Sequence, residues 1–412
     1  MQVKSITPPF TVFAAGLLLT LLSSNGAIAQ TANGKSETVS SDTATQSYKS
    51  QQFNILPENQ LRSRMPVTSS ITPGVAPANA NALITNSGAL PASDIATQLG
   101  TKIVAPSSFG TSRIPYTTSR VLGGTANPAQ TSPYARSGKL YMAFGGNTYN
   151  TVCSASMIGR SLLLTAAHCV HEYGRGNAGW ARRVLFVPAK TNASEPYRSF
   201  ESSQYIIATS YFNGTDTCTV RGIVCNNDVA LIALNNNSLG QQAGNLVGWF
   251  GYGWNGYSFT VPDPSFQNVF GNKLFAAITQ LGYPAALDSG LRMQINTAYG
   301  AFLGNGNLRN TLLGSAMTGG SSGGPWLVNF GDNALGGTYG TASVRNVVVG
   351  VTSYGYVGGP QLQGSSWFGQ NVQFPASAYG TRGAGNIGKL VYDACDNPSL
   401  TAWRLQSRGR CT

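Results

Sequence analysis

Short runs with strand character recur from residue 140 to residue 352, separated by turns rich in glycine, asparagine and serine. They form two series, and their spacing is typical of antiparallel sandwiches or barrels rather than of alternating strands and helices. The 50 glycines suit a turn-rich β protein. We therefore predict an all-β fold with two groups of strands. The first series is Leu140 to Phe144, Val152 to Ile158, Leu162 to Thr165, Val184 to Val187, Tyr205 to Ala208 and Val229 to Leu234. The second is Leu274 to Ile278, Met293 to Ile295, Trp326 to Val328 and Asn346 to Thr352.

Two segments depart from this pattern. Asn235 to Phe266 lies between the two series and is rich in glycine, asparagine and aromatic residues, including Trp249 and Tyr257. We interpret it as the connection between the two groups of strands, with an added binding surface as the alternative. Asn386 to Cys395 carries apolar residues at helical spacing, which predicts a helix near the carboxyl end.

The amino terminus has the features of an export signal. Lys4 supplies a positive charge, Phe10 to Leu22 is apolar, and Ala27-Ile28-Ala29 is a small-x-small cleavage site before Gln30. An apolar run of this length falls short of the roughly 20 residues that span a bilayer. We predict a signal peptide over 1–29, a secreted (extracellular or periplasmic) protein and no stable membrane insertion.

The next segment, 30–120, is rich in serine, threonine, asparagine, alanine and proline and has no cysteine. Such a composition buries little apolar surface, so we predict a propeptide or a disordered leader. Residues 121–412 then form the folded part, and the six cysteines fit an oxidising compartment. The chain has a net charge of +12, but its basic residues are scattered, which argues against nucleic acid as a partner.

Only two histidines occur in the chain, His168 and His171, and both precede the glycine-rich run Gly319 to Pro325. A serine nucleophile at Ser322 would have to give its proton to one of them. The main-chain NH groups of Gly320 and Ser322 would face the developing oxyanion. The run also matches the G-x-S-x-G turn of α/β-hydrolases, but that fold places its histidine after the serine, and no histidine follows Ser322 here.

With the histidine first and the serine last, the acid lies between them in the sequence. Asp228 opens the apolar run Asp228 to Leu234, where a carboxylate at the start of a strand can be held beside a buried imidazole. Asp216 is the second candidate, because Asp228 could instead be a turn residue after Asn226 and Asn227.

The sequences TAAHC at His168, DVALIAL from Asp228 and GSSGGP at Ser322 together resemble the chymotrypsin-like serine peptidases. The resemblance covers roughly Val121 to the carboxy-terminal helix. It implies two antiparallel six-stranded β-barrels packed together with a C-terminal helix, over about 121–240 and about 265–395, with a disulfide-linked tail at 396–412. It also implies that His168 is the base, Asp228 its orienting acid and Ser322 the nucleophile, while His171 has no role and is expected at the surface.

The resemblance also implies a disulfide between Cys153 and Cys169. Cys218 with Cys225, and Cys395 with Cys411, are then pairings of nearest neighbours among the alternatives that six cysteines allow. The serine motif and Leu281 to Pro284 look closer to the bacterial glutamyl-endopeptidase-like branch. In that branch a histidine in the primary specificity pocket binds the substrate glutamate. Both histidines of this chain lie in the segment around His168, so a preference for glutamate by that route is not expected.

Two departures from the family concern activation and specificity. Ser321 stands where trypsin-like members carry the aspartate that pairs with a new amino terminus, so the usual activating ion pair cannot form, although Arg120-Val121-Leu122 resembles an activation site. We expect the leader to be removed near Arg113 or Arg120. Carried over from the family, the pocket floor falls at Ala316 and Met317, where no acid is present. The substrate-pairing strand falls at Thr352, Ser353, Tyr354 and Gly355.

Together these features predict a secreted, monomeric serine endopeptidase that acts on protein or peptide substrates. It needs no cofactor and no metal, and it prefers a neutral or apolar side chain before the scissile bond. The alternative is a catalytically silent or weakly active binding protein on a protease scaffold, which would hold a partner through its basic surface or the aromatic residues between Trp249 and Tyr257.

Overall fold

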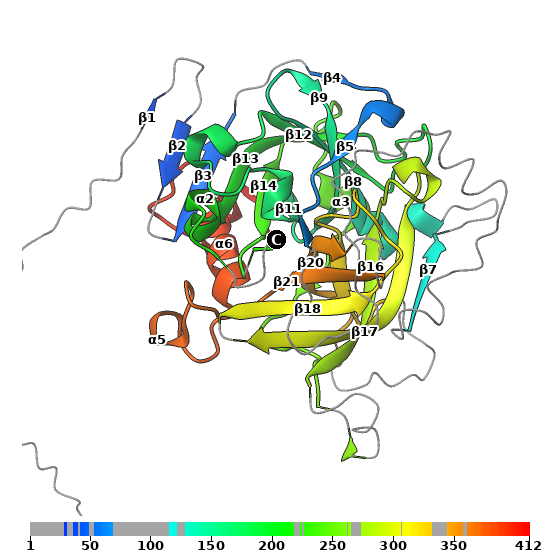
Figure 1. The fold of residues 1–412 in the computed structure, drawn as a ribbon. Helices are drawn as coiled ribbons and strands as arrows, with labels where there is room; N and C mark the ends of the chain where they lie inside the picture. The colour runs from blue at the N-terminus through cyan, green and yellow to red at the C-terminus, as the bar shows by residue number, and fades with distance from the viewer. Residues whose placement is uncertain are drawn as a thin grey trace, which may run out of the picture.

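The chain forms two β-barrels packed side by side in a computed structural model (Figure 1). In Figure 1 the mainly green N-terminal barrel lies above the yellow and orange C-terminal barrel. The structure describes residues 29–30, 36–39, 42–48, 53–68, 115–121, 128–217, 223–224, 226–261, 263–264, 273–305, 307–331, 344–356 and 361–412. Nearly all of the predicted signal peptide lies outside these residues.

The N-terminal barrel is a closed ring of six antiparallel strands, in which β8 pairs with β10 and β12, and β14 closes the ring between β11 and β13. Strands β11 and β14 are continuous apolar runs because nearly every side chain is buried, whichever way it points. The six strands are β8 (Ser137–Ala143), β10 (Thr151–Met157), β11 (Leu162–Thr165), β12 (Arg183–Pro188), β13 (Phe200–Ala208) and β14 (Ala230–Leu234).

The C-terminal barrel is a second closed ring of six antiparallel strands, in the order β16, β17, β18, β21, β20 and β19. Its strands are β16 (Phe275–Gly282), β17 (Gln294–Asn305), β18 (Leu308–Gly314), β19 (Pro325–Val328), β20 (Val347–Tyr356) and β21 (Leu362–Trp367). The predicted all-β fold of two six-stranded barrels is confirmed.

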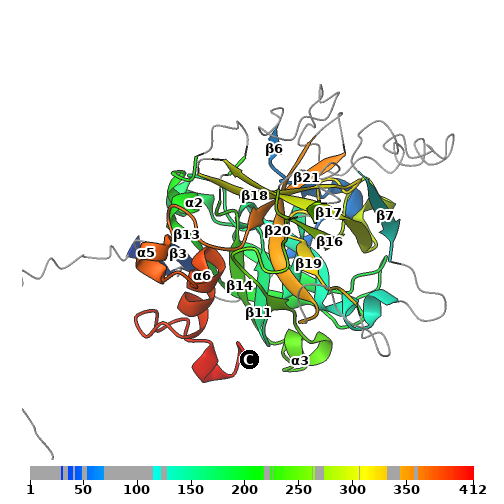
Figure 2. The ribbon, with the colours of Figure 1, turned by 90° about the horizontal axis from the view of Figure 1, so that it is seen from below.

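The helices are few and short in the described part of the chain. They are α2 (Thr209–Asn213), α3 (Ala243–Val247), α5 (Ala376–Tyr379) and α6 (Gly385–Cys395). The predicted carboxy-terminal helix is α6, which packs on β13 and β14 of the N-terminal barrel through Ile387 and Leu390 (Figure 2). No helix among the described residues is long and apolar enough to cross a membrane.

The connection between the barrels is partly built into the second one. It contains α3 and the short strand β15 (Gly251–Tyr252), which pairs in parallel with β20. Trp249 packs against the core, and the indole NH of the exposed Trp254 donates to the Arg382 carbonyl at 3.1 Å. The described aromatic residues of this segment thus serve mainly as packing.

Parts of the leader are folded onto both barrels, so the disordered alternative is wrong for them. Strand β3 (Thr43–Ser47) pairs antiparallel with β13, although all its side chains except that of the buried Ala44 are polar. A strand can add to a sheet through main-chain hydrogen bonds alone, which is why composition did not reveal it. The other leader strands are β2 (Ser36–Val39), β4 (Asn54–Ile55), β5 (Arg62–Ser63), β6 (Val67–Thr68) and β7 (Tyr116–Arg120), and β1 (Ala29–Gln30) spans the boundary between the predicted signal peptide and the leader.

Candidate active site

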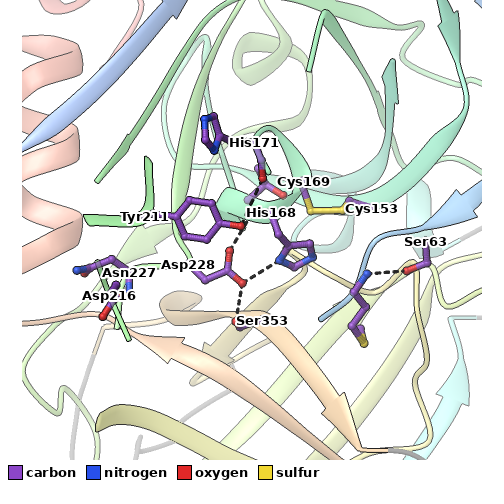
Figure 3. Close-up of polar contacts among 12 residues, drawn as sticks. Ser63, Cys153, His168, Cys169, His171, Tyr211, Asp216, Asn227, Asp228 and Ser353 are labelled. Atoms are coloured by element: carbon purple, nitrogen blue, oxygen red, sulfur yellow. Dashed lines mark hydrogen bonds and ion pairs between the residues drawn. A yellow bond between two sulfur atoms is a disulfide. The ribbon is translucent and has the colours of Figure 1, made fainter. Parts of the chain in front are cut away.

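The candidate base lies directly after β11, on the short turn Ala167–Cys169. The apolar residues Leu162 to Leu164 fix this strand in the barrel, and the chain then turns so that the His168 side chain faces the junction between the barrels (Figure 3). The ring is almost fully buried.

Asp228 holds this histidine by two contacts. Its Oδ1 accepts the main-chain NH of His168 at 2.9 Å, and its Oδ2 lies 2.8 Å from His168 Nδ1 (Figure 3). Ser353 of β20 donates its hydroxyl to the same Oδ2 at 2.5 Å. A carboxylate in this position fixes the imidazole with Nδ1 protonated, so that Nε2 is left to accept a proton.

Ser322 lies in the turn between β18 and β19, and the glycines of its motif are required by space. Gly320 has φ +100°, and a Cβ there would lie 2.5 Å from the Tyr283 carbonyl oxygen. Gly323 has φ +73°, and its Cβ would lie 2.0 Å from the Thr165 hydroxyl. A larger residue at Gly323 would push the turn away from the first barrel, and one at Gly320 would push it away from the segment after β16.

Ser154 of β10 anchors the same turn to the N-terminal barrel. Its NH donates to the Ser322 carbonyl at 2.7 Å, and its hydroxyl donates to the Gly320 carbonyl at 2.8 Å while it accepts the Tyr283 NH at 2.9 Å. Both barrels therefore position the turn that carries Ser322.

Ser322 Oγ and His168 Nε2 are both buried, and neither has a hydrogen-bond partner among the described residues. Catalytic hydrogen bonds are often long or poorly aligned until a substrate is bound. At the junction of the barrels, these two atoms are thus available to bond with each other or with a substrate. The other ring nitrogen of His168 is already bonded to Asp228.

The other candidates for base and acid have separate positions. His171 was expected at the surface, and this is wrong: its ring is fully buried and stacks edge-on to Trp180 with centroids 4.7 Å apart. Burial lowers its pKa to about 4, against the hydrogen bond that its Nε2 shares with the Gly176 carbonyl at 2.7 Å. Its aromatic surroundings disfavour the charged imidazolium, so the ring is buried in its neutral form.

Asp216, the second candidate for the acid, supports the loop before Asp228. Its carboxylate accepts the main-chain NH of Asn226 at 3.0 Å and that of Asn227 at 2.6 Å. Burial raises its pKa, against the effect of these hydrogen bonds. Among the described residues, the Asp216 carboxylate forms no hydrogen bond with either histidine.

The candidate substrate-binding residues divide into two groups. The Thr352 hydroxyl points into the barrel, where it accepts from Gln280 at 2.8 Å and from the Trp326 indole at 2.9 Å, and Tyr354 packs in an apolar cluster with Leu362. Ser353 contacts Asp228, as described. Gly355 offers its main-chain NH outward, and that NH donates to the carbonyl of Pro66 at 3.3 Å.

Beside the candidate pocket floor at Ala316 and Met317 lies a residue that the sequence did not point to. Gln363 of β21 is buried and donates to the Met317 carbonyl at 2.7 Å and to the Ser321 hydroxyl at 3.1 Å. Ser321 in turn donates to the Thr318 carbonyl at 2.8 Å, and the Ala316 NH donates to Thr118 of β7 at 3.0 Å. Neutral hydrogen bonds thus hold the turn at Ser321, the position where an activating aspartate was expected from the resemblance to trypsin-like members.

Two disulfides lie in the described residues, Cys153–Cys169 and Cys395–Cys411, and both match the expected pairings. Cys218 and Cys225 lie outside the described residues.

Cys153, His168 and Cys169 have potential ligand atoms within 4.8 Å of one another, but the two sulfurs are bonded to each other. They therefore offer no thiolates to a metal ion.

Comparisons with known proteins identify the family of the chain. The family model described as Trypsin matches residues 123–365, more than half of the chain. The chain is 25% identical over 120 residues to the extracellular metalloprotease of Bacillus subtilis, which covers 29% of this chain and 33% of that protein. It is 26% identical over 142 residues to the glutamyl endopeptidase of Bacillus licheniformis, which covers 34% of this chain and 40% of that protein. The chain thus spans less than half the length of these curated relatives.

Solved structures are similar over most of their own length. The protease Anisep from Arthrobacter nicotinovorans is 26% identical with a TM-score of 0.41, over 61% of this chain and 96% of that chain. A Glu endopeptidase in complex with MPD is 17% identical with a TM-score of 0.41, over 61% of this chain and 90% of that one. Because the family match takes in His168, Asp228 and Ser322 and most of both barrels, the chain belongs to the trypsin family of serine endopeptidases.

Proposed function

We propose that the protein hydrolyses peptide bonds with His168, Asp228 and Ser322 as a catalytic triad. The observation that supports this most is the pair of contacts from Asp228 to His168, at 2.9 and 2.8 Å (Figure 3), on the barrel to which the Ser154 NH ties the Ser322 carbonyl at 2.7 Å. Ser322 Oγ attacks the substrate carbonyl while His168 Nε2 accepts its proton and then gives it to the leaving amine. Water enters next and is deprotonated by the same nitrogen, which releases the acyl group and restores Ser322.

The developing oxyanion would lie against the main-chain NH groups of Gly320 and Ser322. The hydrogen bonds from Ser154 to the Gly320 and Ser322 carbonyl groups hold this turn in the chain without a bound substrate. Preformed donors need no reorganisation during the reaction, which is the basis of their effect on rate.

The specificity we propose is for a neutral or apolar side chain before the scissile bond. Met317 and Gln363 lie at the candidate pocket, and neither carries a charge. A substrate lysine or arginine would be buried there without a counter-ion. Profiling on a mixed peptide library would contradict this specificity if cleavage followed lysine, arginine or glutamate.

We propose export through the signal peptide 1–29, with the leader 30–120 removed from the peptidase domain 121–412. Arg120 lies in β7, which pairs with β17, and its guanidinium donates to Asp288 at 2.5 Å. Cleavage at Arg120 thus requires β7 to separate from the barrel, while Arg113 lies outside the described residues. Amino-terminal sequencing of the secreted, active protein would reject this if the leader were still attached.

One experiment separates an enzyme from a silent binding protein on the same scaffold. The secreted protein is treated with a fluorophosphonate probe and tested for casein hydrolysis, with Ser322→Ala as the control. Labelling that maps to Ser322, together with hydrolysis that the control lacks, supports the enzyme. Folded and processed protein that neither reacts nor hydrolyses casein would leave the binding protein as the better explanation.

A further inference from the structure

A short part of the leader, residues 61–68, crosses from one barrel to the other beside the candidate active site. Its strand β5 pairs in parallel with Thr151 and Val152 of β10, and its strand β6 pairs in parallel with Gly355 and Tyr356 of β20. Figure 2 shows β6 next to the β20 and β21 end of the C-terminal barrel. In the view of Figure 3, Ser63 lies on the side of His168 away from Asp228.

Met65 places its side chain in the candidate specificity pocket. It is only 5% exposed, and its sulfur lies 3.9 Å from Gln363 Nε2, the atom that also donates to the Met317 carbonyl. A Cβ on Gly355 would lie 3.0 Å from the same sulfur, so the methionine packs directly on the glycine of β20. An uncharged, unbranched side chain therefore fills the space between the pocket floor and β20.

The main chain around Met65 also occupies main-chain positions at which a peptide substrate would be expected to bind. The Pro66 carbonyl accepts the Gly355 NH at 3.3 Å. On the other side, a Cβ on Gly319 would lie 2.5 Å from the Ser63 hydroxyl, so this part of the leader lies against the residue before Gly320. A peptide substrate cannot occupy these positions at the same time.

The leader fills this cleft without presenting a bond for attack. Among the hydrogen bonds of the described residues, none joins the NH of Gly320 or Ser322 to a leader carbonyl, and Ser322 Oγ has no partner. Nucleophilic attack needs the carbonyl at the nucleophile and its oxygen at the oxyanion donors. A segment bound in this way blocks the site and is not cleaved by it.

Contacts on the N-terminal barrel hold the segment in place. Leu61 is 1% exposed and packs in a cluster with Tyr141 and Val152. Arg64 forms an ion pair with Glu172 at 2.9 Å and lies over the Phe144 ring, 4.0 Å from its centroid. The segment is thus docked on one barrel and reaches into the cleft of the other.

We propose that residues 61–68 are an intramolecular inhibitor that occupies the substrate cleft, with Met65 in the primary specificity pocket. This inference rests on the proposed peptidase function. It means that the full chain is inactive because of a bound segment, and that activation requires this segment to leave rather than an ion pair to form at Ser321.

The test uses the full chain and measures how fast a fluorophosphonate probe labels Ser322, with mass spectrometry to verify that the chain is intact. In Met65→Asp an unpaired charge would be buried in the pocket, so the segment should leave the cleft and labelling should accelerate by roughly tenfold or more. Met65→Leu keeps an apolar side chain, and Ile55→Asp adds a charge at an exposed leader position. Both controls should label within about twofold of the parent.

Equal labelling of Met65→Asp and the parent chain would overturn the proposal. A second measurement, hydrogen exchange in the Ser322→Ala chain, does not depend on catalysis. The Gly355 NH should be protected there, and Met65→Asp should remove that protection while β11 and β14 stay unchanged. If no chain reacts with the probe, including the secreted, leader-free protein, the peptidase function fails. The exchange result then decides separately whether the segment occupies the cleft, and an unprotected Gly355 would overturn that occupancy.

Discussion

Replacing Glu58 with glutamine tests how strongly the leader is held on the N-terminal barrel. Glu58 accepts from Lys139 Nζ at 2.6 Å and from the Tyr141 hydroxyl at 2.6 Å, and Lys139 also donates to the Gly290 carbonyl at 2.8 Å. The Lys139 side chain is 2% exposed, whereas that of Glu58 is 29% exposed. Burial lowers the pKa of Lys139 despite the neighbouring carboxylate.

Removing one partner of a fully buried ion pair costs about 3–5 kcal/mol. Glu58→Gln should cost less, about 2 kcal/mol, because water reaches Glu58 and glutamine still offers an acceptor to Lys139. Every 1.4 kcal/mol is a factor of ten, so the equilibrium between docked and undocked leader should shift by about 30-fold.

Hydrogen exchange of the Arg62 NH, which donates to the Asn150 carbonyl at 3.0 Å, reports this equilibrium. We expect its protection in the Ser322→Ala chain to fall by about 30-fold in Glu58→Gln. Glu172→Gln is the matched control, because its ion pair with Arg64 is far more exposed and should change protection by about twofold. A change below twofold in Glu58→Gln would refute the reasoning that this pair docks the leader.

Three further outcomes follow from the described contacts. In the processed enzyme, Asp228→Asn should lower kcat by roughly 10⁴-fold, because an amide favours the wrong tautomer of His168, and steady-state kinetics would show this. Since burial lowers the pKa of His171 to about 4, the free energy of unfolding should fall by up to about 3 kcal/mol as pH drops from about 6.5 to 4. Urea titrations should show a flatter profile for His171→Gln. Replacing both Cys153 and Cys169 with serine should cost about 3 kcal/mol, measured in the same titrations.

The sequence predicted the barrels well where strands are apolar and poorly where they are not. The runs at β11 and β14 were visible because their side chains are buried on every side. Strands β18 and β21 were missed because they bury polar residues such as Asn310 and Gln363, which are satisfied by hydrogen bonds such as that from the Tyr354 hydroxyl at 3.2 Å. Such partners come from distant parts of the chain, so a local pattern does not reveal them.

The candidate site was predictable in its motifs but not in its surroundings. The residues of the motifs at His168 and Asp228 meet in space as expected. The burial of His171 and the contact of Met65 with Gln363 join residues that are 40 and about 300 positions apart, since His171 meets Tyr211. No short-range periodicity marks either of them.

The position of α6 bears on the order in which the protein is made. The N-terminal barrel closes with β14 at Leu234, yet part of its outer face is covered by α6 and the tail, where Cys411 accepts the Arg160 NH at 3.1 Å. These covering residues are synthesised after both barrels, whereas β3 is synthesised before the first barrel and pairs with its strand β13. Domains generally fold in order of synthesis. While the second barrel is being synthesised, the first barrel is therefore covered on this side by its leader strands but not yet by α6. Chain termination shortly before Gly385 would leave the α6 contact surface on β13 and β14 open to water in an otherwise closed pair of barrels.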